Sequence, residues 1–479
     1  MPLDRVKQFI AGSWTDAEDS FDVRSPIDDA LVATVARADE KAVDCAVESA
    51  VTTMSRTAST PAAVRAQWCH GAARAIESRS EELALAICRE EGKPLAEARL
   101  EVTFAIQGME CFQRETLNGS AETLVVNDPN KRVLVLRQPR AVWAVLTPWN
   151  FPVNIPIEYL GPAIATGSPV VWKPAPTTTA VAALLLEVLL EGGVPPELIN
   201  LVHSDSIALA KYLVTHPGVG CVGLTGGPNA GRAVAQAAWD KHLLLELGGN
   251  GPTIVLADAD IEKASAGIAV GAFFNAGQVC SAAGRVLVHR AIADELAAAL
   301  TQRTREWPVG NPTEEGIAVG PLHLDSVATT VNRHVSDALD RGAKLLAGGT
   351  RVTGMPTSRY YLPTVLDEVS VDSLVNAEET FGPVAAIVRQ TDDEELLETA
   401  CRTQYGLACA IYTESVSRAF KLAERLPSGT VVVNDASSYW EHNLSFGGWA
   451  GTLSGRGRLG GRYVLNEFTQ TKTVSFDVQ

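Results

Sequence analysis

Continuous apolar runs and amphipathic stretches alternate through the middle of the chain. Four apolar runs are short and lack helical periodicity, which indicates buried strands: residues 141–146, 170–172, 200–202 and 221–225. Stretches with apolar residues at helical spacing follow the later runs: residues 179–191, 207–215 and 228–239. Regular alternation of strand and helix predicts an α/β fold with a doubly wound parallel sheet.

A second alternation begins at Leu243 and predicts a second α/β domain. Its expected strands are 253–256, 285–289 and 384–388, and its expected helices are 261–274, 291–305 and 325–341. The N-terminal part has short strands and turns and then helical periodicity: residues 8–25, 39–55, 61–92 and 95–115. Two further segments alternate with period 2 and predict strands: 131–138 and 467–476. We expect another subunit to cover the exposed edge of the second one.

The composition is that of a globular protein with several domains. Of 479 residues, 46% are hydrophobic and 20% are charged, and about 150 residues per domain predicts two or three domains. The formal net charge of −16 argues against a nucleic-acid partner, because phosphate binding needs a basic surface. No apolar run reaches the roughly 18–20 residues that span a bilayer, and the N-terminus lacks the pattern of a signal peptide.

The eight cysteines are scattered, without a CxxC pair and without histidines at zinc-binding spacing. We therefore expect reduced thiols, no metal site and a cytoplasmic location. Cys280 differs from the others because it lies in a connection, between the predicted helix 261–274 and strand 285–289. Connections often hold catalytic residues, and Gly277 allows a tight turn beside this thiol. A buried structural cysteine is the alternative interpretation.

Two polar residues belong to the ends of apolar runs, where ligands of parallel sheets bind. Asn150 follows the run 141–146, and its side-chain amide can donate hydrogen bonds to a developing oxyanion. A turn asparagine beside Pro152 is the alternative. Glu246 lies within an apolar run, where burial would raise its pKa toward the range of a general base. A structural salt bridge is the alternative for Glu246.

Glycines join the strand 221–225 to the following helix, in Thr225-Gly226-Gly227-Pro228. Such a helix N-terminus can bind a pyrophosphate through free backbone N–H groups and the helix dipole. The segment is not a GxGxxG motif, and alone it is weak evidence.

Together these segments resemble the NAD(P)-dependent aldehyde dehydrogenase superfamily over nearly the whole chain. The resemblance is carried by seven motifs in this order: Thr147-Pro148-Trp149-Asn150-Phe151-Pro152, Lys173-Pro174-Ala175, Leu224-Thr225-Gly226-Gly227, Leu245-Glu246-Leu247-Gly248-Gly249-Asn250, Gly277-Gln278-Val279-Cys280, Glu378-Glu379-Thr380-Phe381-Gly382-Pro383-Val384 and Ser445-Phe446-Gly447-Gly448. It implies a Rossmann-type cofactor domain, an α/β catalytic domain and a small β oligomerisation element. Their expected limits are 1–117 with 141–246, then 247–445, and finally 118–140 with 446–479.

The resemblance also implies roles for individual residues. Cys280 attacks the aldehyde carbon, Asn150 and the Cys280 backbone N–H form the oxyanion hole, and Glu246 activates the water that hydrolyses the thioester. Lys173 is expected to hold the adenosine ribose, and Glu379 the nicotinamide ribose. The full set of expected cofactor residues is Thr147, Pro148, Trp149, Lys173, Ala175, Pro176, Gly226, Gly227, Leu247, Glu379 and Phe381. The expected substrate channel contains Phe151, Glu158, Val279, Ser281, Trp440 and Phe446.

The chain departs from the family pattern at several positions. Pro176 replaces a glutamate that NAD-preferring members use for the ribose hydroxyls, which favours NADP over NAD; the alternative is that Pro176 only stiffens the turn. Gly227 stands where a serine is common. Tyr159 replaces a lysine, and Leu459 replaces the glutamate that often partners it, which suggests that different neighbours tune Glu246 or that the proton leaves by another route.

Substrate choice rests on the channel. Branches that oxidise succinic semialdehyde carry arginines at positions that correspond to Glu158 and Asn275, so a dicarboxylic semialdehyde is disfavoured. A neutral, aromatic or cationic aldehyde is expected instead, unless Glu158 pairs with a nearby arginine. Trp440 belongs to a loop expected at the entrance, and His442 of the same loop is expected to be solvated.

The sequence thus predicts oxidation of an aldehyde to the free carboxylic acid with NADP or NAD. Alternatives are a CoA-acylating aldehyde dehydrogenase, a cysteine hydrolase or acyltransferase without redox chemistry, and a non-catalytic role. The strands 131–138 and 466–476 predict a homodimer or homotetramer.

Overall fold

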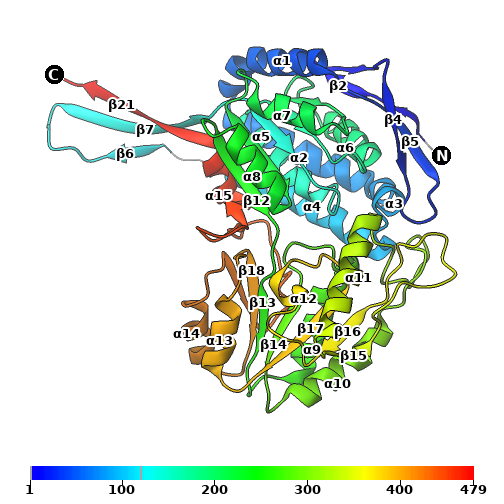
Figure 1. Ribbon diagram of the computed structural model, residues 1–479. Helices are drawn as coiled ribbons and strands as arrows, with labels where there is room; N and C mark the ends of the chain where they lie inside the picture. The colour runs from blue at the N-terminus through cyan, green and yellow to red at the C-terminus, as the bar shows by residue number, and fades with distance from the viewer. Residues whose placement is uncertain (1–2, 119–120) are drawn as a thin grey trace.

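The computed structural model describes residues 3–118 and 121–479 and consists of two α/β lobes and a projecting three-stranded sheet (Figure 1). The N-terminal lobe and the C-terminal α15 lie together in the upper half of Figure 1, and the second lobe lies below. The chain passes from the first lobe to the second after Leu247 and returns after Val433, so residues distant in sequence meet at their junction.

The first lobe contains an eight-stranded sheet in the order β20-β12-β11-β8-β9-β10-β2-β3. The five central strands are parallel, and β20, β2 and β3 are antiparallel to their neighbours. The strands are β20 (Gly455–Arg456), β12 (His242–Leu247), β11 (Cys221–Gly226), β8 (Trp143–Leu146), β9 (Val170–Lys173), β10 (Ile199–Leu201), β2 (Gln8–Ile10) and β3 (Ser13–Thr15). A separate three-stranded sheet at the N-terminal edge contains β1 (Leu3–Val6), β5 (Leu31–Ala36) and β4 (Ser20–Arg24).

Helices cover both faces of this sheet, because side chains of its strands alternate between two cores. Trp143 and Val145 belong to the core under one group of helices: α2 (Ala62–Ser78), α3 (Ser80–Glu91), α4 (Leu95–Leu117), α5 (Asn154–Thr166), α6 (Thr179–Glu191) and α15 (Gly461–Phe468). Ala144 belongs to the core under the other group: α1 (Glu40–Ala58), α7 (Ile207–Thr215) and α8 (Pro228–Ala237). The doubly wound arrangement predicted from the sequence is confirmed.

Two features of this lobe differ from the sequence prediction. The helical stretch 61–92 is two helices, because the backbone leaves helical geometry at Arg79 between α2 and α3. The guanidinium of Arg79 then bonds Glu82, Glu187 and Glu191 across the break. Helix α5 was not predicted, since it is buried on all sides and contains Pro162, so it shows no amphipathic pattern.

The second lobe contains a seven-stranded sheet in the order β15-β16-β17-β14-β13-β18-β19, in which β15 alone is antiparallel to its neighbour. The strands are β15 (Lys344–Ala347), β16 (Thr364–Asp367), β17 (Val384–Gln390), β14 (Arg285–His289), β13 (Pro252–Val255), β18 (Ala408–Tyr412) and β19 (Thr430–Val433). Its helices are α9 (Ile261–Phe273), α10 (Ala293–Arg303), α11 (Asp325–Asp340), α12 (Leu374–Ala377), α13 (Asp393–Cys401) and α14 (Val416–Ala423). The second α/β unit expected after Leu243 is therefore present.

A third sheet, in the order β21-β7-β6, projects from the first lobe at the left of Figure 1. β21 (Thr469–Asp477) pairs antiparallel with β7 (Lys131–Pro139) along its whole length, and β7 also pairs with β6 (Glu122–Leu124). β21 remains an edge strand of this sheet, a position that other chains can extend. Residues between the second sheet and β21 return to the first lobe, where β20 pairs with β12 and α15 packs against α5.

Across residues 3–118 and 121–479, no helix has both the length and the apolar character needed to cross a membrane.

Candidate active site

Cys280 lies in the turn that connects α9 to β14. This turn begins with a short 3-10 helix, η1 (Phe274–Gly277), in which Asn275, Ala276 and Gly277 have φ of 49°, 53° and 72°. Left-handed backbone costs a non-glycine residue about 1–3 kcal/mol. At Gly277 a side chain is excluded, because a Cβ would lie 2.1 Å from the carbonyl oxygen of Gly382. Cys280, which follows this turn, is partly exposed as a residue.

Asn150 is buried in the turn after β8, and its backbone and side chain both face the Cys280 turn. Its Nδ2 donates to the Gln278 carbonyl oxygen at 2.9 Å, and its own carbonyl accepts from Asn275 Nδ2 at 3.0 Å. Because an amide nitrogen carries two hydrogens, one N–H of Asn150 remains for an oxygen near the thiol.

Glu246 lies near the carboxyl end of β12, where its register partners are Thr225 of β11 and Gly455 of β20. Its carboxylate is buried, and burial raises the pKa of Glu246 to about 7, although the neighbouring Cys280 and Thr225 side chains oppose the rise. Burial and the adjacent Glu246 carboxylate raise the pKa of the Cys280 thiol well above its usual value. The two groups therefore control each other's protonation.

Asn150, Glu246 and Cys280 share one cavity of about 210 Å³ at the junction of the lobes. Ten other residues line it: Pro148, Trp149, Ile155, Thr225, Gly226, Gly227, Leu247, Gly248, Glu379 and Phe381. The structure thus brings together the three residues selected for catalysis and seven of those selected for cofactor binding. Their alignment at the carboxyl ends of β8, β11 and β12 follows from the parallel sheet.

Lys173 ends β9, next to the cavity, and its register partner is Leu146 of β8. It is buried, and burial lowers the pKa of its ammonium to about 8. Within the described residues no hydrogen bond or ion pair of this ammonium is seen, which is costly for a buried charge. A hydroxyl or phosphate oxygen of a bound nucleotide would satisfy it. Ala175 and Pro176 follow directly, whereas Thr147 has its hydroxyl occupied by Trp172 Nε1 at 2.9 Å.

The glycines at the N-terminus of α8 leave room for a phosphate. Gly227 caps this helix, and a Cβ at Gly227 would meet no atom within 4 Å. Free N–H groups at such a terminus bind anions. Without a side chain at Gly227, the backbone N–H groups at the start of α8 are accessible from the cavity, as pyrophosphate binding requires.

Glu379 and Phe381 close the opposite wall of the cavity. Glu379 accepts the Gly249 N–H at 2.8 Å, and burial raises the pKa of Glu379 to about 8. Phe381 has a φ of 54° and lies edge-on to Trp149, with ring centroids 5.6 Å apart. Glu379 could hold the ribose of a nicotinamide nucleotide, and Phe381 could contact its nicotinamide ring.

The aromatic residues selected for the substrate channel take part in two aromatic pairs. Phe151 stacks near Phe274 with ring centroids 6.1 Å apart, and Trp440 lies edge-on to Phe446 at 4.9 Å. Val279 and Ser281 flank Cys280 and are buried.

One expectation about the channel loop was wrong, and two neighbouring residues are placed by the same contacts. His442 is 5% exposed and not solvated, and its Nδ1 lies 2.6 Å from Glu158 Oε1. Glu158 therefore pairs with a histidine, not an arginine. Asn275 does not face the channel, because its side chain turns inward to the carbonyls of Asn150 and Gln278. The pattern of exposed loop residues around 442 gave no sign that this loop folds onto α5.

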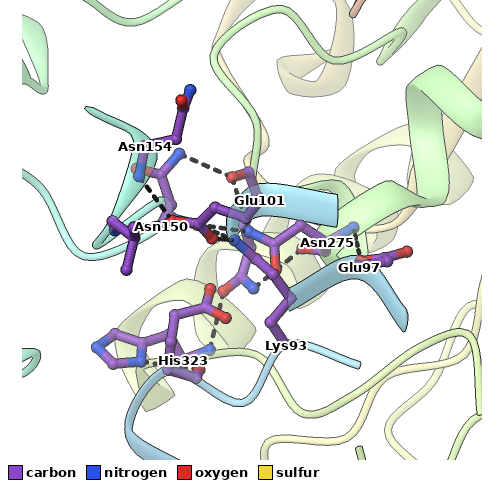
Figure 2. Close-up of polar contacts among 10 residues, drawn as sticks. Lys93, Glu97, Glu101, Asn150, Asn154, Asn275 and His323 are labelled. Carbon is purple, nitrogen blue, oxygen red and sulfur yellow. Dashed lines mark hydrogen bonds and ion pairs between the residues drawn. The ribbon is translucent and has the colours of Figure 1, made fainter. Parts of the chain in front are cut away.

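A buried polar network under the catalytic turns was missed by the sequence analysis (Figure 2). Lys93, from the connection between α3 and α4, forms an ion pair with Glu101 and donates to the Asn150 carbonyl oxygen at 2.7 Å. Glu101 in turn accepts the N–H groups of Val153 and Asn154 at 2.8 and 3.1 Å. Glu97, one turn earlier on α4, accepts the Asn275 N–H at 2.8 Å. Glu101, together with Lys93, therefore fixes the Asn150 turn to α4, and Glu97 fixes the turn before Cys280 to the same helix.

His323 joins this network to the nucleotide side of the cavity. Its ring stacks on Trp149 with centroids 4.5 Å apart, and its nitrogens contact Glu91 O and Thr177 Oγ1 at 3.0 and 2.7 Å. Burial lowers the pKa of His323 to about 4, so the ring is neutral at pH 7. The sequence carries one sign of part of the network: Glu97 and Glu101 are four residues apart and so share a helix face.

Comparison with known proteins places this cavity in context. The model of the aldehyde dehydrogenase family matches residues 14–474. An NADP⁺ succinate-semialdehyde dehydrogenase of Escherichia coli (strain K12) is 34% identical over 98% of this chain and 97% of its own. A vanillin dehydrogenase of Corynebacterium glutamicum is 32% identical over 98% of both chains.

Solved structures agree with these matches. A succinate-semialdehyde dehydrogenase from Burkholderia pseudomallei superposes with a TM-score of 0.96 at 34% identity, over 99% of this chain and 98% of that one. A betaine aldehyde dehydrogenase from Staphylococcus aureus, in complex with NAD⁺, has a TM-score of 0.94 at 27% identity, over 99% and 95%.

Proposed function

Since the chain belongs to the aldehyde dehydrogenase family, we propose that it oxidises an aldehyde to the free carboxylic acid through a thioester on Cys280. The observation that supports this most strongly is the shared cavity of Asn150, Glu246 and Cys280. One relative is named for NADP⁺, and one similar structure was solved with NAD⁺. The cofactor of this chain is therefore NADP or NAD, as the resemblance implied.

In the first step the Cys280 thiol loses its proton to solvent, its sulfur forms a bond to the aldehyde carbon as the carbonyl double bond opens, and the carbonyl oxygen takes up the negative charge. The free N–H of Asn150 and the Cys280 backbone N–H are the donors for that oxygen. NAD(P)⁺, when bound, supplies the acceptor for the hydride that leaves the carbon, and collapse of the oxyanion gives the thioester.

In the second step water attacks the thioester carbon and Glu246 takes its proton. The carbon–sulfur bond then breaks, which releases the acid and returns the sulfur to Cys280. A carboxyl group with a pKa near 7 suits this role, because it is largely ionised above neutral pH and can still carry a proton. Retention of Glu246 favours water over CoA as the group that resolves the thioester.

We favour NADP over NAD because Pro176 supplies no carboxylate beside the nucleotide ribose. The unpaired ammonium of Lys173 is available to a 2′-phosphate. Asp205 is the nearby opposing charge, but it is held by Arg37 through two hydrogen bonds of 2.9 and 3.1 Å.

The sequence-based argument against a dicarboxylic semialdehyde needs correction, because relatives at 34% identity bear the name succinate-semialdehyde dehydrogenase. Two substrate classes are therefore candidates. The aromatic pairs Phe151–Phe274 and Trp440–Phe446 favour an aldehyde with a flat apolar group, and a vanillin dehydrogenase is among the relatives. The names of the other relatives favour a carboxyl-bearing aldehyde.

The test is formation of NADPH or NADH with a panel of benzaldehyde-type, short aliphatic, amino-bearing and carboxyl-bearing aldehydes. We expect a signal that requires Cys280, that is lost in Cys280→Ala, and that does not depend on CoA. CoA-dependent product would favour the acylating alternative. Hydrolysis of esters without any reduced nucleotide would favour a non-redox cysteine enzyme.

We also propose that the chain forms a homodimer or homotetramer through 118–140 and 446–479 and acts in the cytoplasm. The edge strand β21 and the exposed Leu124, Val125 and Phe476 support this assembly. Light scattering of the full chain and of a Phe476→Lys variant measures the oligomeric state. A monomeric full chain would contradict the proposed assembly.

A further inference from the structure

Tyr159 is a fully buried residue of α5 that lies behind the active-site cavity, not on its wall. Its hydroxyl is 2.8 Å from Thr225 Oγ1, and no other hydrogen bond of this hydroxyl is seen in the described part of the chain. Room for the ring comes from Gly223 of β11, where a Cβ would lie 2.7 Å from two ring carbons. The strand and helix are therefore fitted to an aromatic side chain at position 159.

Thr225 connects Tyr159 to Glu246. In the parallel pair β11–β12, Thr225 and Glu246 are register partners, so their side chains stand side by side on the same face. The partner of Glu246 on its other side is Gly455, which has no side chain. The Thr225 hydroxyl is consequently the one side-chain group that the neighbouring strands place beside this carboxylate, and the buried Oε1 of Glu246 has no hydrogen-bond partner among the described residues.

The direction of the Tyr159–Thr225 hydrogen bond, and of the contact that Thr225 can offer Glu246, follows from the number of protons. Thr225 has a single O–H, so it can donate to Glu246 only if it accepts from Tyr159. The Tyr159 hydroxyl is a donor across the neutral range, because burial raises the pKa of this phenol far above its usual value. The arrangement is thus Tyr159 to Thr225 to Glu246.

We propose that Tyr159 is a positioning residue for thioester hydrolysis: its hydroxyl turns the Thr225 proton toward Glu246 and thereby supports the ionised base. This inference rests on the function proposed above. The other titratable groups that face Glu246 are Cys280 and Glu379, and Glu158 lies next to Tyr159 on α5. Since none of these groups is a cation, hydroxyl donors are the means by which the chain stabilises the Glu246 carboxylate.

The role is tested with Tyr159→Phe, which removes one oxygen and keeps the ring against Gly223. We expect the acid limb of the hydrolysis rate to move to higher pH by roughly half to one unit, since a carboxylate that loses a hydrogen bond gains a proton more easily. At pH 7 the steady-state rate should fall about three- to tenfold. The first turnover, followed as a burst of NAD(P)H, should keep its rate and amplitude.

Thr225→Val supplies a second variant of the same chain of hydroxyls and should shift the same limb in the same direction. Tyr360→Phe is the matched control, because it removes another buried tyrosine hydroxyl, one that donates to Ile27 O at 3.2 Å away from the cavity. This control should leave the pH profile unchanged. Thermal unfolding with and without NADP⁺ shows that each variant is folded.

An acid limb that stays in place in folded Tyr159→Phe and Thr225→Val would overturn the inference. A loss of burst and steady-state rate by equal factors at all pH values would also overturn it, since that result indicates a general structural role. Failure of the wild-type chain to reduce NAD(P)⁺ with any aldehyde would instead reject the proposed function. The two failures are therefore distinguishable.

Discussion

The Nζ of Lys93 lies 2.7 Å from the carbonyl oxygen of Asn150, so a buried ammonium holds the backbone of the residue proposed to stabilise the oxyanion. The same ammonium lies 3.9 Å from the centre of the Phe151 ring and pairs with Glu101. Both charged side chains are fully buried. An electrostatic site depends on donors held in place before the reaction, and this contact supplies that rigidity.

Lys93→Met should destabilise the fold by about 3–5 kcal/mol, because it leaves the Glu101 charge buried without its partner. Chemical denaturation measures this change. Lys131→Met is the control: it breaks an ion pair with Asp477 in which the side chains are 36% and 54% exposed, and it should have no measurable effect. Equal stability of the two variants would contradict the account.

Where Lys93→Met is folded, the rate of the first turnover should fall about 100-fold, because the Asn150 amide loses its fixed position. The affinity for NADP⁺ should change little, since Lys93 is not on the wall of the cavity. A variant with weak nucleotide binding and a normal first turnover would show that the network serves the cofactor and not Asn150.

The pH dependence of thioester hydrolysis should report Glu246. Below its pKa of about 7 the carboxyl is protonated and cannot take a proton from water, so the rate should fall as the pH drops below neutral. In Glu246→Gln this fall of the rate at acid pH should disappear, together with most of the hydrolysis. A rate that is level from pH 5 to 8 in the wild type would mean that another group is the base.

The reactivity of the Cys280 thiol should report the charge on the neighbouring Glu246. The Glu246 carboxylate helps to raise the pKa of the thiol, so Glu246→Gln should lower that pKa and speed alkylation of Cys280 by iodoacetamide at pH 7–8. Mass spectrometry of the modified peptide measures the rate. Slower alkylation in Glu246→Gln would indicate that Glu246 activates the thiol as a base.

The nucleotide preference should follow position 176. Pro176→Glu introduces a carboxylate beside the ribose, which repels a 2′-phosphate and can accept hydrogen bonds from ribose hydroxyls. We expect kcat/KM with NADP to fall at least about tenfold relative to kcat/KM with NAD. A wild-type preference for NAD would remove the NADP proposal before the variant is made.

Much of the first lobe was predictable, because its buried strands and amphipathic helices follow simple periods. Helices α6 and α7 begin and end at the predicted residues, and in the second lobe β14 does too. Asn150 and Cys280 could be selected because they lie in connections between regular elements, and Glu246 because it is a carboxylate within an apolar run. α5 could not be predicted, since a helix buried on all sides has no polar face to mark its period.

The network beneath the site was unpredictable for a different reason. Lys93 and Glu101 look like surface residues of a helix in sequence, and only the packing of α4 under the Asn150 turn makes them buried. The same holds for Glu158 and His442, which are 284 positions apart. Contacts between distant segments depend on tertiary packing, and local patterns carry no information about them.

The measurement that tests the central claim most directly is the burst of NAD(P)H in Glu246→Gln, mixed with an accepted aldehyde. The account predicts about one equivalent of reduced nucleotide per Cys280 and then almost no turnover, because the thioester forms but is not hydrolysed. A covalent acyl adduct on Cys280 should be found by mass spectrometry at the end of the burst. Full steady-state turnover in this variant, or the absence of both burst and adduct, would contradict the assignment of Cys280 and Glu246.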